Sequence, residues 1–581
     1  SVLRFNYTVG SGHASNDLDY KATTSLALNG GTIKDRSTNA NVATRTLFSP
    51  AGTNSLGANE ALVIDGSVPT FVRAFQYDTD GNGNIDEIVV EMNEAVLDAS
   101  VAHGDFALQS GSSVTGFSSF SSGSRANTKD AADNDEFITL EVSVTGTADV
   151  TVGYTDNNSG NDLEDLAGND AATTSSITTS DQAAPVIIAA QTKDTNGNGK
   201  IDRIDLTFSE DLDDSGGSNM NNNSFTLGSG YNVADVKTGD TGDDEFLRVL
   251  VTEKSSVDSD VTPTITMGAS KIADAGNNMA AQSAFTPSDG AAPIVINVNS
   301  NTAAGRYEIG DEIDVLITFS ETVDVTGIPR LTLETGSSDA VVNYTSGTTT
   351  SVLRFNYTVG SGHASNDLDY KATTSLALNG GTIKDRSTNA NVATRTLFSP
   401  AGTNSLGANE ALVIDGSVPT FVRAFQYDTD GNGNIDEIVV EMNEAVLDAS
   451  VAHGDFALQS GSSVTGFSSF SSGSRANTKD AADNDEFITL EVSVTGTADV
   501  TVGYTDNNSG NDLEDLAGND AATTSSITTD DKAAPVIIAA QTKDNDGDGK
   551  IDRIDLTFSE DLDDSGGANF ATNSFTLGSP Y

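Results

Sequence analysis

Residues 1–179 of this chain recur without a single change as residues 351–529. The match continues with scattered substitutions to Tyr581, so the sequence samples a repeat with an offset of 350 residues. A long fixed repeat limits the architecture to an array of related folding units. Because residues 1–5 match the interior of a continuous segment at 351–355, we expect the chain to be a window of a longer array.

The charge balance restricts the partners of the chain. It holds 29 Lys and Arg against 85 Asp and Glu, a formal net charge of −56. Nucleic acid is excluded as a partner because binding its phosphates requires clustered basic residues. Like charges repel one another over about 8 Å at physiological salt. Either bound cations or a high-salt environment must therefore relieve this repulsion, and a halophilic origin would explain the acidity without a metal.

The chain contains no cysteine, which excludes disulfides and thiolate metal sites. Small modules without disulfides often need another cross-link, and a metal ion bound by oxygen ligands is the alternative that this composition favours. No run of apolar residues approaches the about 18 of a membrane helix, so we expect no membrane-spanning segment.

Short segments that pair an aspartate with a proline divide the repeat. They begin at Asp65, Asp181, Asp289, Asp415 and Asp531 and end four residues later at a proline. Proline among small residues at such spacing is typical of a stiff linker between domains. The predicted modules are a partial A module at 1–69, B at 70–185, C at 186–293, A at 294–419, B at 420–535 and a partial C module at 536–581.

Within each module the apolar residues repeat with a period of two. Ile313, Val315, Ile317 and Phe319 alternate with polar residues, and similar runs occupy 138–144 and 353–359. Alternation bounded by Gly, Asn, Asp and Ser clusters is typical of half-buried β-strands. Several short strands in about 110 residues predict an all-β fold, with each module a two-sheet, immunoglobulin-like β-sandwich.

The modules share two short motifs. The first is an early strand that ends in glutamate. Its three versions are Ile317-Thr318-Phe319-Ser320-Glu321, Leu206-Thr207-Phe208-Ser209-Glu210 and Val90-Glu91-Met92-Asn93-Glu94. The second is a late turn with an aspartate at its third position and an asparagine at its end, and its versions are Leu163-Glu164-Asp165-Leu166-Ala167-Gly168-Asn169, Ile272-Ala273-Asp274-Ala275-Gly276-Asn277 and Ile383-Lys384-Asp385-Arg386-Ser387-Thr388-Asn389. This pairing resembles the bacterial immunoglobulin-like repeats of giant calcium-dependent surface proteins and adhesins. The resemblance covers essentially the whole chain. It implies an extracellular location on a bacterial cell surface, in a stalk, fibre or adhesin.

The strongest chemical signal is an Asp- and Asn-rich loop in the B module. Oxygen-bearing side chains occupy positions 1, 3, 5 and 9 of the loop, a glycine occupies position 6, and a backbone carbonyl is available at position 7. This spacing wraps hard oxygen ligands around one point, as Ca²⁺ requires. The predicted ligands are Asp78, Asp80, Asn82, Asn84 and Asp86, and in the second copy Asp428, Asp430, Asn432, Asn434 and Asp436.

The C modules carry a related loop. Its predicted ligands are Asp194, Asn196, Asn198, Lys200 through its carbonyl, Asp202 and Asp205, and in the later copy Asp544, Asp546, Asp548, Lys550, Asp552 and Asp555. Two asparagines of the earlier C loop are replaced by aspartates in the later copy, a change that keeps oxygen ligands in place. This exchange favours a metal loop.

The loops depart from the EF-hand in two respects. In the earlier B loop, position 12 is Val89, so the bidentate glutamate of an EF-hand is missing and water or Glu87 must replace it. A strand rather than a helix follows each loop. The alternative is an ordinary hairpin turn rich in Asx and Gly; four loops with this spacing favour calcium.

Two other groups of acids leave both interpretations open. The five linker aspartates could add calcium sites between modules, or each could simply begin a proline-containing turn. The Asp165 and Asn169 type of segment more often caps a turn than binds a metal.

Catalysis is not expected from this sequence. The histidines His13 and His103, and their copies His363 and His453, lie in polar loops without partners at zinc spacing. The chain has no tryptophan to form a sugar-stacking platform.

We therefore predict a non-enzymatic, calcium-stiffened extracellular rod, the repeat region of a giant bacterial surface adhesin. The first alternative is a self-assembling extracellular filament or surface-layer subunit whose partners are copies of itself. A weaker alternative is an array of carbohydrate-binding modules.

Overall fold

A computed structural model describes most of the chain. The described residues are 1–109, 112–118, 130, 132–156, 162–213, 221–238, 244–268, 272–274, 282–459, 462–468, 480, 482–506, 512–563 and 575–578. They divide into two compact units, Ser1–Ala291 with Ser387–Asn389, and Ala292–Arg386 with Ala390–Tyr581, and each is considered by itself. Within the described ranges, no helix has the length and apolar character needed to cross a membrane.

The B module occurs in both units with the same strand order. In the first copy the order is β5-β8-β9-β3-β4-β7-β6. Strand β9 joins two layers, because Thr174–Thr178 pair with β8 and Thr179–Asp181 pair in parallel with β3. The elements are β3 (Phe71–Tyr77), β4 (Ile85–Met92), η1 (Asp98–Ser100), η2 (His103–Asp105), β5 (Phe106–Leu108), β6 (Ser113–Ser118), β7 (Phe137–Val144), β8 (Thr151–Tyr154) and β9 (Thr174–Asp181).

The second B module repeats these elements 350 residues later. They are β27 (Phe421–Tyr427), β28 (Ile435–Met442), η3 (Asp448–Ser450), η4 (His453–Asp455), β29 (Phe456–Leu458), β30 (Ser463–Ser468), β31 (Phe487–Val494), β32 (Thr501–Tyr504) and β33 (Thr524–Asp531). The pairings match those of the first copy strand for strand.

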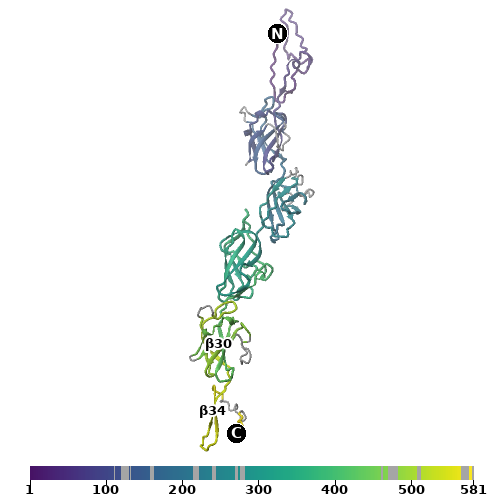
Figure 1. The fold of residues 1–581 in the computed structure, drawn as a ribbon. Helices are drawn as coiled ribbons and strands as arrows, with labels where there is room; N and C mark the ends of the chain where they lie inside the picture. Colours follow the sequence, from purple (N-terminus) through teal and green to yellow (C-terminus); the bar gives the residue numbers. More distant parts are fainter. Residues whose placement is uncertain are drawn as a thin grey trace. The chain divides into compact units, whose positions relative to one another are not determined.

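The C module at 186–293 has two separate sheets, β10-β11-β14-β13 and β12-β15-β16. Its strands are β10 (Ile187–Lys193), β11 (Arg203–Phe208), β12 (Phe225–Leu227), β13 (Val233–Thr238), β14 (Phe246–Val251), β15 (Ile265–Met267) and β16 (Gln282–Phe285). The second C segment contributes a two-stranded sheet of β34 (Ile537–Lys543) and β35 (Arg553–Phe558), which Figure 1 shows near the C-terminus.

The A module at 294–419 has a larger sheet ordered β17-β19-β22-β21-β20-β24, with β25 also paired to β19, and a smaller sheet ordered β18-β26-β23. Its elements are β17 (Val295–Ser300), β18 (Gly305–Tyr307), β19 (Glu312–Thr326), β20 (Arg330–Leu333), β21 (Ala340–Ser346), β22 (Thr350–Thr358), β23 (Ala364–Ser365), β24 (Leu376–Ala377), β25 (Thr382–Asp385), α2 (Leu406–Asn409) and β26 (Leu412–Asp415). The N-terminal segment, which shares its sequence with the second half of this module, holds only β1 (Ala14–Ser15), α1 (Leu56–Asn59) and β2 (Ile64–Asp65).

Apolar residues spaced by two form the cores, as the sequence predicts. In the A module, Ile313, Val315 and Ile317 of β19 are fully buried and lie opposite Tyr357, Phe355 and Leu353 of β22. The other large clusters of buried apolar residues lie within 71–183, 187–285 and 421–533. The chain is thus all-β and consists of tandem β-sandwich modules. The module limits inferred from the linkers stay a prediction.

The exact repeat supplies a matched test of the core. Phe355 has no exposed surface, whereas Phe5, in the same local sequence, is 75% exposed. Phe355→Ala should destabilise the A module by about 3–5 kcal/mol because it leaves a cavity, and Phe5→Ala should change stability by less than about 0.5 kcal/mol. Hydrogen exchange of the β19 and β22 amides measures this locally. Equal effects of the two substitutions would contradict the assigned cores.

Candidate metal sites

The loop between β3 and β4 is folded around its first aspartate. Asp78 accepts hydrogen bonds from the backbone N–H groups of Gly81 at 2.8 Å, Asn82 at 3.2 Å and Gly83 at 2.7 Å. Both glycines have a positive φ, +72° and +84°, which a side chain would strain. The loop closes because Asp86 accepts from the N–H and hydroxyl of Thr79.

Three carboxylates of this loop converge. Ligand-type oxygens of Asp78, Asp80 and Asp86 lie within 4.8 Å of one another. Asn82 and Asn84 complete the loop: Asn84 donates to the Asn82 Oδ1 atom, and Asn84 Oδ1 accepts from the Gly146 N–H at 2.9 Å. The donor set contains oxygen alone, which suits a hard cation such as Ca²⁺.

The structure also places the two residues that bear on the missing twelfth ligand. Val89 is fully buried in a small apolar cluster with Phe75 and Tyr77. Glu87 is almost fully buried on β4. Burial, with a smaller contribution from the charge of Glu87, raises the pKa of Tyr77 to about 12. Glu87 is therefore part of the sheet.

The copy of this loop repeats the same hydrogen bonds. Asp428 accepts from the N–H groups of Gly431, Asn432 and Gly433, Thr429 donates to Asp436, and Asn432 donates to Asp430. The Asn434 Oδ1 atom accepts from the Gly496 N–H, as Asn84 does from Gly146.

The C-module loop gains a carboxylate that its spacing does not reveal. Glu253, which follows β14, accepts from the Asn196 side chain at 2.7 Å and from the Asn198 side chain at 3.0 and 3.1 Å. Asp194 accepts from the Gly199 N–H, and Asp202 from Thr195, as in the B loop. Glu253 thus supplies a carboxylate to the loop from the segment that follows β14.

A buried acid, Asp258, also anchors this loop. The Asp258 carboxylate accepts from the Ile201 N–H at 2.9 Å and from the Tyr231 hydroxyl, while its own N–H donates to the Gly199 carbonyl. The Lys200 N–H donates to Asn198 Oδ1 at 2.9 Å. Glu253 and Asp258 are both more than 50 residues from the loop, so no motif spacing could have identified them.

The predicted twelfth-position ligands of the C loops are held by arginines. Asp205 lies on β11 with its Oδ1 atom 2.7 Å from Arg203 Nε, and Asp555 lies at the same distance from Arg553 Nε on β35. Their roles as ligands stay predictions, and each would require its ion pair to open.

The last loop is the most carboxylate-rich. Asp544 accepts from the N–H groups of Gly547 and Gly549, and these backbone hydrogen bonds lower the pKa of its carboxyl group. Asp548 lies 3.2 Å from Lys550 Nζ. The remaining predicted ligands differ in their contacts: Asp546 accepts from the Asp548 N–H and Asp552 from the Asn545 N–H.

The B loop differs from the last loop because it touches the next module. A Cβ atom on Gly83 would lie 2.8 Å from Ile188 Cγ2 and 3.2 Å from Val186 Cγ2, and Gly433 meets Ile538 and Val536 in the same way. Burial raises the pKa of Asp78, although hydrogen bonds from three backbone N–H groups oppose the shift. The loop is thus packed against the first strand of the C module in both copies.

This contact can be tested with two glycines of one loop. Gly81→Ala and Gly83→Ala both strain a positive φ, at a cost of about 1 kcal/mol each. Only the Gly83 substitution collides with Ile188, since a Cβ atom on Gly81 meets nothing within 4 Å. Spin labels on Cys introduced at the exposed Ser143 and Thr252 should give a broader distance distribution for Gly83→Ala than for Gly81→Ala. Identical distributions would show that the contact does not fix the junction.

The linker aspartates combine the two roles that the sequence left open. Each accepts a hydrogen bond from the N–H two residues onward, so each begins a turn, at 2.8 to 3.3 Å. Asp65, Asp181 and Asp415 also lie in groups of carboxylates whose oxygens come within 4.8 Å of one another. These groups are Asp65 with Glu94 and Asp165, Asp181 with Glu210 and Asp274, and Asp415 with Glu444 and Asp515.

The shared motifs supply the other two members of each group. The glutamate ends the early strand motif, and the second aspartate comes from the late turn, where Asp165 also accepts from Ala167 and Asn169 as a turn cap. Residues 275–277 of the C-module turn lie outside the described residues. Turn capping and carboxylate clustering therefore coexist.

The group at Asp181 borders a strongly acidic cavity of about 700 Å³. Burial raises the pKa of Glu210 to about 9, with further contributions from a hydrogen bond to Asp181 and from the charges of Asp181 and Asp274. A carboxyl group in this position holds a proton near neutral pH unless a cation replaces it. The acidic residues that line the cavity are Asp149, Asp181, Glu210, Asp211, Glu245 and Asp274.

The raised pKa of Glu210 predicts a pH dependence. In the unfolded chain the Glu210 carboxyl group has the ordinary glutamate pKa of 4.5, whereas in the folded chain its pKa is about 9. The folded state binds more protons in that interval, so stability should fall as pH rises from about 5 to 9. Glu210→Gln should be as stable as the parent at pH 5 and more stable at pH 9, in thermal unfolding with a chelator.

Glu245→Gln, on the wall of the same cavity, is the matched control and should follow the parent curve. Parallel curves for the parent and Glu210→Gln across this pH range would contradict the assignment.

The histidines take part in local contacts. His363 Nδ1 lies 2.8 Å from the Tyr357 hydroxyl and accepts from the Gly360 N–H, and His13 makes the same contacts with Tyr7 and Gly10. These interactions fix a tight turn after β22 in the A module. His103 and His453 begin short 3₁₀ turns.

A curated protein shares sequence with part of the chain. The outer cell wall protein of Brevibacillus brevis (strain 47 / JCM 6285 / NBRC 100599) is 32% identical over 187 residues, 30% of this chain and 18% of that protein. The chain thus spans less than a fifth of its relative's length. No protein-family model matches the sequence.

Two solved structures resemble the chain weakly. Domains 1–6 of the surface layer protein SbsC match with 10% identity, 79% of this chain, 66% of that chain and a TM-score of 0.14. The titin I-band fragment I67–I69 matches with 8% identity, 60% of this chain, 96% of that chain and a TM-score of 0.17. TM-scores this low do not show that the domains of these proteins are arranged as in this chain, so the fold assignment depends on the sheets described above.

Proposed function

We propose that this chain is a structural segment of a bacterial cell-surface protein, in which Ca²⁺ bound by the loops and between modules stiffens a tandem array of β-sandwiches. The observation that carries the proposal is the B loop, where three carboxylates converge beside the contact of Gly83 with the C module. A cation at that point would hold together a loop that packs across a junction. No catalytic role is proposed.

The ion would supply charge neutralisation. Asp78, Asp80 and Asp86 would hold it in the B loop, and Asp194, Asp202 and Glu253 in the C loop. At the junction, Asp181, Glu210 and Asp274 would bind the ion in place of the proton that Glu210 otherwise retains. Binding to the folded state alone would then add directly to stability.

The similarity to an outer cell wall protein supports a place on the cell surface and favours a surface-layer subunit over the stalk of an adhesin. In a surface layer, stiff modules would position contacts between copies of the chain. In an adhesin, the same modules would serve as a spacer. The two roles share the calcium-dependent rigidity and differ in self-association.

Thermal unfolding with EDTA, with millimolar Ca²⁺, and with Mg²⁺ at matched ionic strength tests the proposal. We expect a rise in the unfolding midpoint that is specific to Ca²⁺, because the flexible oxygen-rich loops suit the larger ion. The double variant Asp78→Ala with Asp428→Ala should lose much of this rise, and Asp260→Ala, an exposed acid outside the clusters, should keep it. Equal midpoints in Ca²⁺ and Mg²⁺ would reduce the effect to charge screening.

A further inference from the structure

Two buried carboxyl groups of the B module belong neither to its loop nor to its junction. Asp98 begins the 3₁₀ turn η1 and Asp130 precedes β7, and the two residues are 6% and 0% exposed. Asp98 Oδ2 accepts from the Asn134 N–H at 3.1 Å, and Asp130 Oδ2 accepts from the Thr139 hydroxyl. The other oxygen of each group, Oδ1, is buried without a hydrogen-bond partner among the described residues. Such a buried acceptor is costly unless another group satisfies it.

Backbone contacts bring these two carboxyl groups to the same turn, which ends at Asp135. The Val96 N–H donates to the Asp135 carbonyl at 2.9 Å, and the Asp98 N–H donates to Asn134 Oδ1 at 3.0 Å. Burial raises the pKa of Asp130 to about 7, and the charges of Asp135 and Asp98 act in the same direction. Burial also raises the pKa of Asp98. The carboxyl groups are therefore near enough for each charge to disfavour the next.

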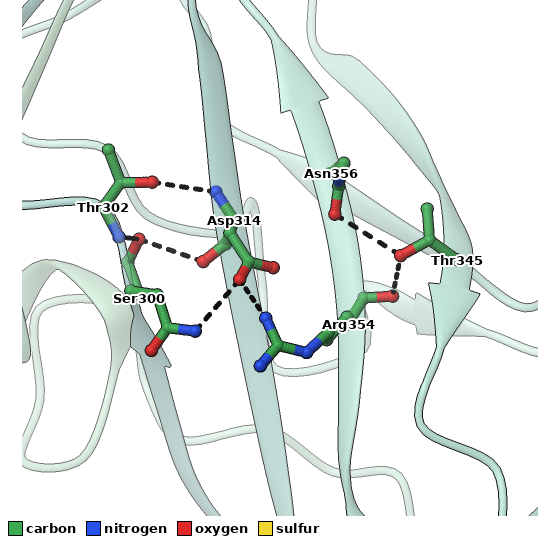
Figure 2. Close-up of polar contacts among 7 residues, drawn as sticks. Ser300, Thr302, Asp314, Thr345, Arg354 and Asn356 are labelled. Atoms are coloured by element: carbon green, nitrogen blue, oxygen red, sulfur yellow. Dashed lines mark hydrogen bonds and ion pairs between the residues drawn. The ribbon is translucent and has the colours of Figure 1, made fainter.

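The A module holds a carboxylate on its sheet in a different way. Figure 2 shows Asp314 on β19 forming an ion pair with Arg354 on β22, and Asp314 Oδ2 also accepts from the Asn301 side chain at 3.1 Å. Within the described part of the B module, neither Asp98 nor Asp130 has a lysine or arginine partner. Their negative charge is thus not balanced by any described side chain.

We propose that Asp98 and Asp130 bind a Ca²⁺ ion inside the B module, and that Asp448 and Asp480 bind one in its copy. The two Oδ1 atoms are hard oxygen ligands of the kind that Ca²⁺ prefers, and water completes the coordination. In the copy, Oδ1 of Asp448 and of Asp480 are likewise buried without a partner among the described residues. The ion ties the η1 turn to the segment that leads into β7.

This site is separate from those of the proposed function. It lies inside a single module, whereas the proposed function places its ions in the oxygen-rich loops and between modules. Its carboxyl groups come from the segment after β4 and the segment before β7, and neither segment belongs to a loop with the Asp, Asn and Gly spacing. It can therefore be tested while the loops are disabled.

Hydrogen exchange of the full chain at about pH 8 tests the site locally, because the Asp130 carboxyl group has lost most of its proton there. The amides of Val96 and Asn134 report on it, since they donate to the Asp135 carbonyl and the Asp98 carboxylate. We expect Ca²⁺ to slow their exchange about tenfold relative to EDTA. Mg²⁺ and Na⁺ at matched ionic strength should leave exchange near the EDTA rate.

The two B modules give peptides of identical sequence, so every substitution is made in both copies. The experiment is repeated in a chain with Asp78→Ala and Asp428→Ala, which removes the first predicted ligand of each B loop. The slowing by Ca²⁺ should persist in this chain, because the ion bound by Asp98 and Asp130 acts without the loop.

Asp130→Asn with Asp480→Asn should abolish the slowing, and Asp98→Asn with Asp448→Asn should do the same. Both pairs should fold, and in EDTA their unfolding midpoints should equal or exceed that of the parent, because each substitution removes a buried charge. In Ca²⁺ the order of midpoints should reverse.

Asp133→Asn with Asp483→Asn is the matched control, because these exposed acids lie in the same turn. This pair should keep the full response to Ca²⁺. Equal exchange in Ca²⁺ and EDTA would overturn the proposal and show that the carboxyl groups hold a proton only. So would a response that survives Asp130→Asn with Asp480→Asn, that the control pair also loses, or that disappears when the loops are disabled. Loops that fail to bind Ca²⁺ would contradict the proposed function and leave this response in place.

Discussion

The central strand of each sandwich is the element on which the rest of the structure depends. In the complete modules, β4, β11 and β19 each pair on both sides. Strands β11 and β19 bury apolar residues at alternate positions, and β4 buries apolar residues on both of its faces. The oxygen-rich loops of the B and C modules lead directly into this strand, and the glutamate of each junction group follows it at Glu94 or Glu210. One strand therefore fixes the core, the loop at one end and the junction carboxylate at the other.

This arrangement concentrates negative charge where modules meet. Burial raises the pKa of Glu94, Glu210 and Glu444, and the negative charges of the two aspartates near each glutamate raise it further. Such a site has two ways to avoid repulsion: it retains a proton or it binds a cation. The surface charge of the chain can be screened by salt, but the junction charges are partly shielded from salt by the protein around them.

The strands and the positions of the oxygen-rich loops could be predicted from the sequence. Alternation of apolar residues located β19 and β22, and the Asp, Asn and Gly spacing located loops whose first aspartates are held by backbone N–H groups. It could not reveal Glu253 or Asp258, because those residues reach the loop through tertiary folding. Nor could spacing show that Asp205 is paired with Arg203, or that Gly83 contacts Ile188 of the next module.

The parallel pairing of β9 with β3 has a mechanical consequence. Strand β3 begins just after the linker that enters the B module, and β9 ends at Asp181, where the chain leaves it. Ala74 lies opposite Thr179 and Gln76 opposite Asp181, so the entering and leaving strands run side by side in the same direction. Tension along the chain would pull them past each other and load all of their hydrogen bonds together. The module would thus resist stretching as a whole instead of opening one bond at a time.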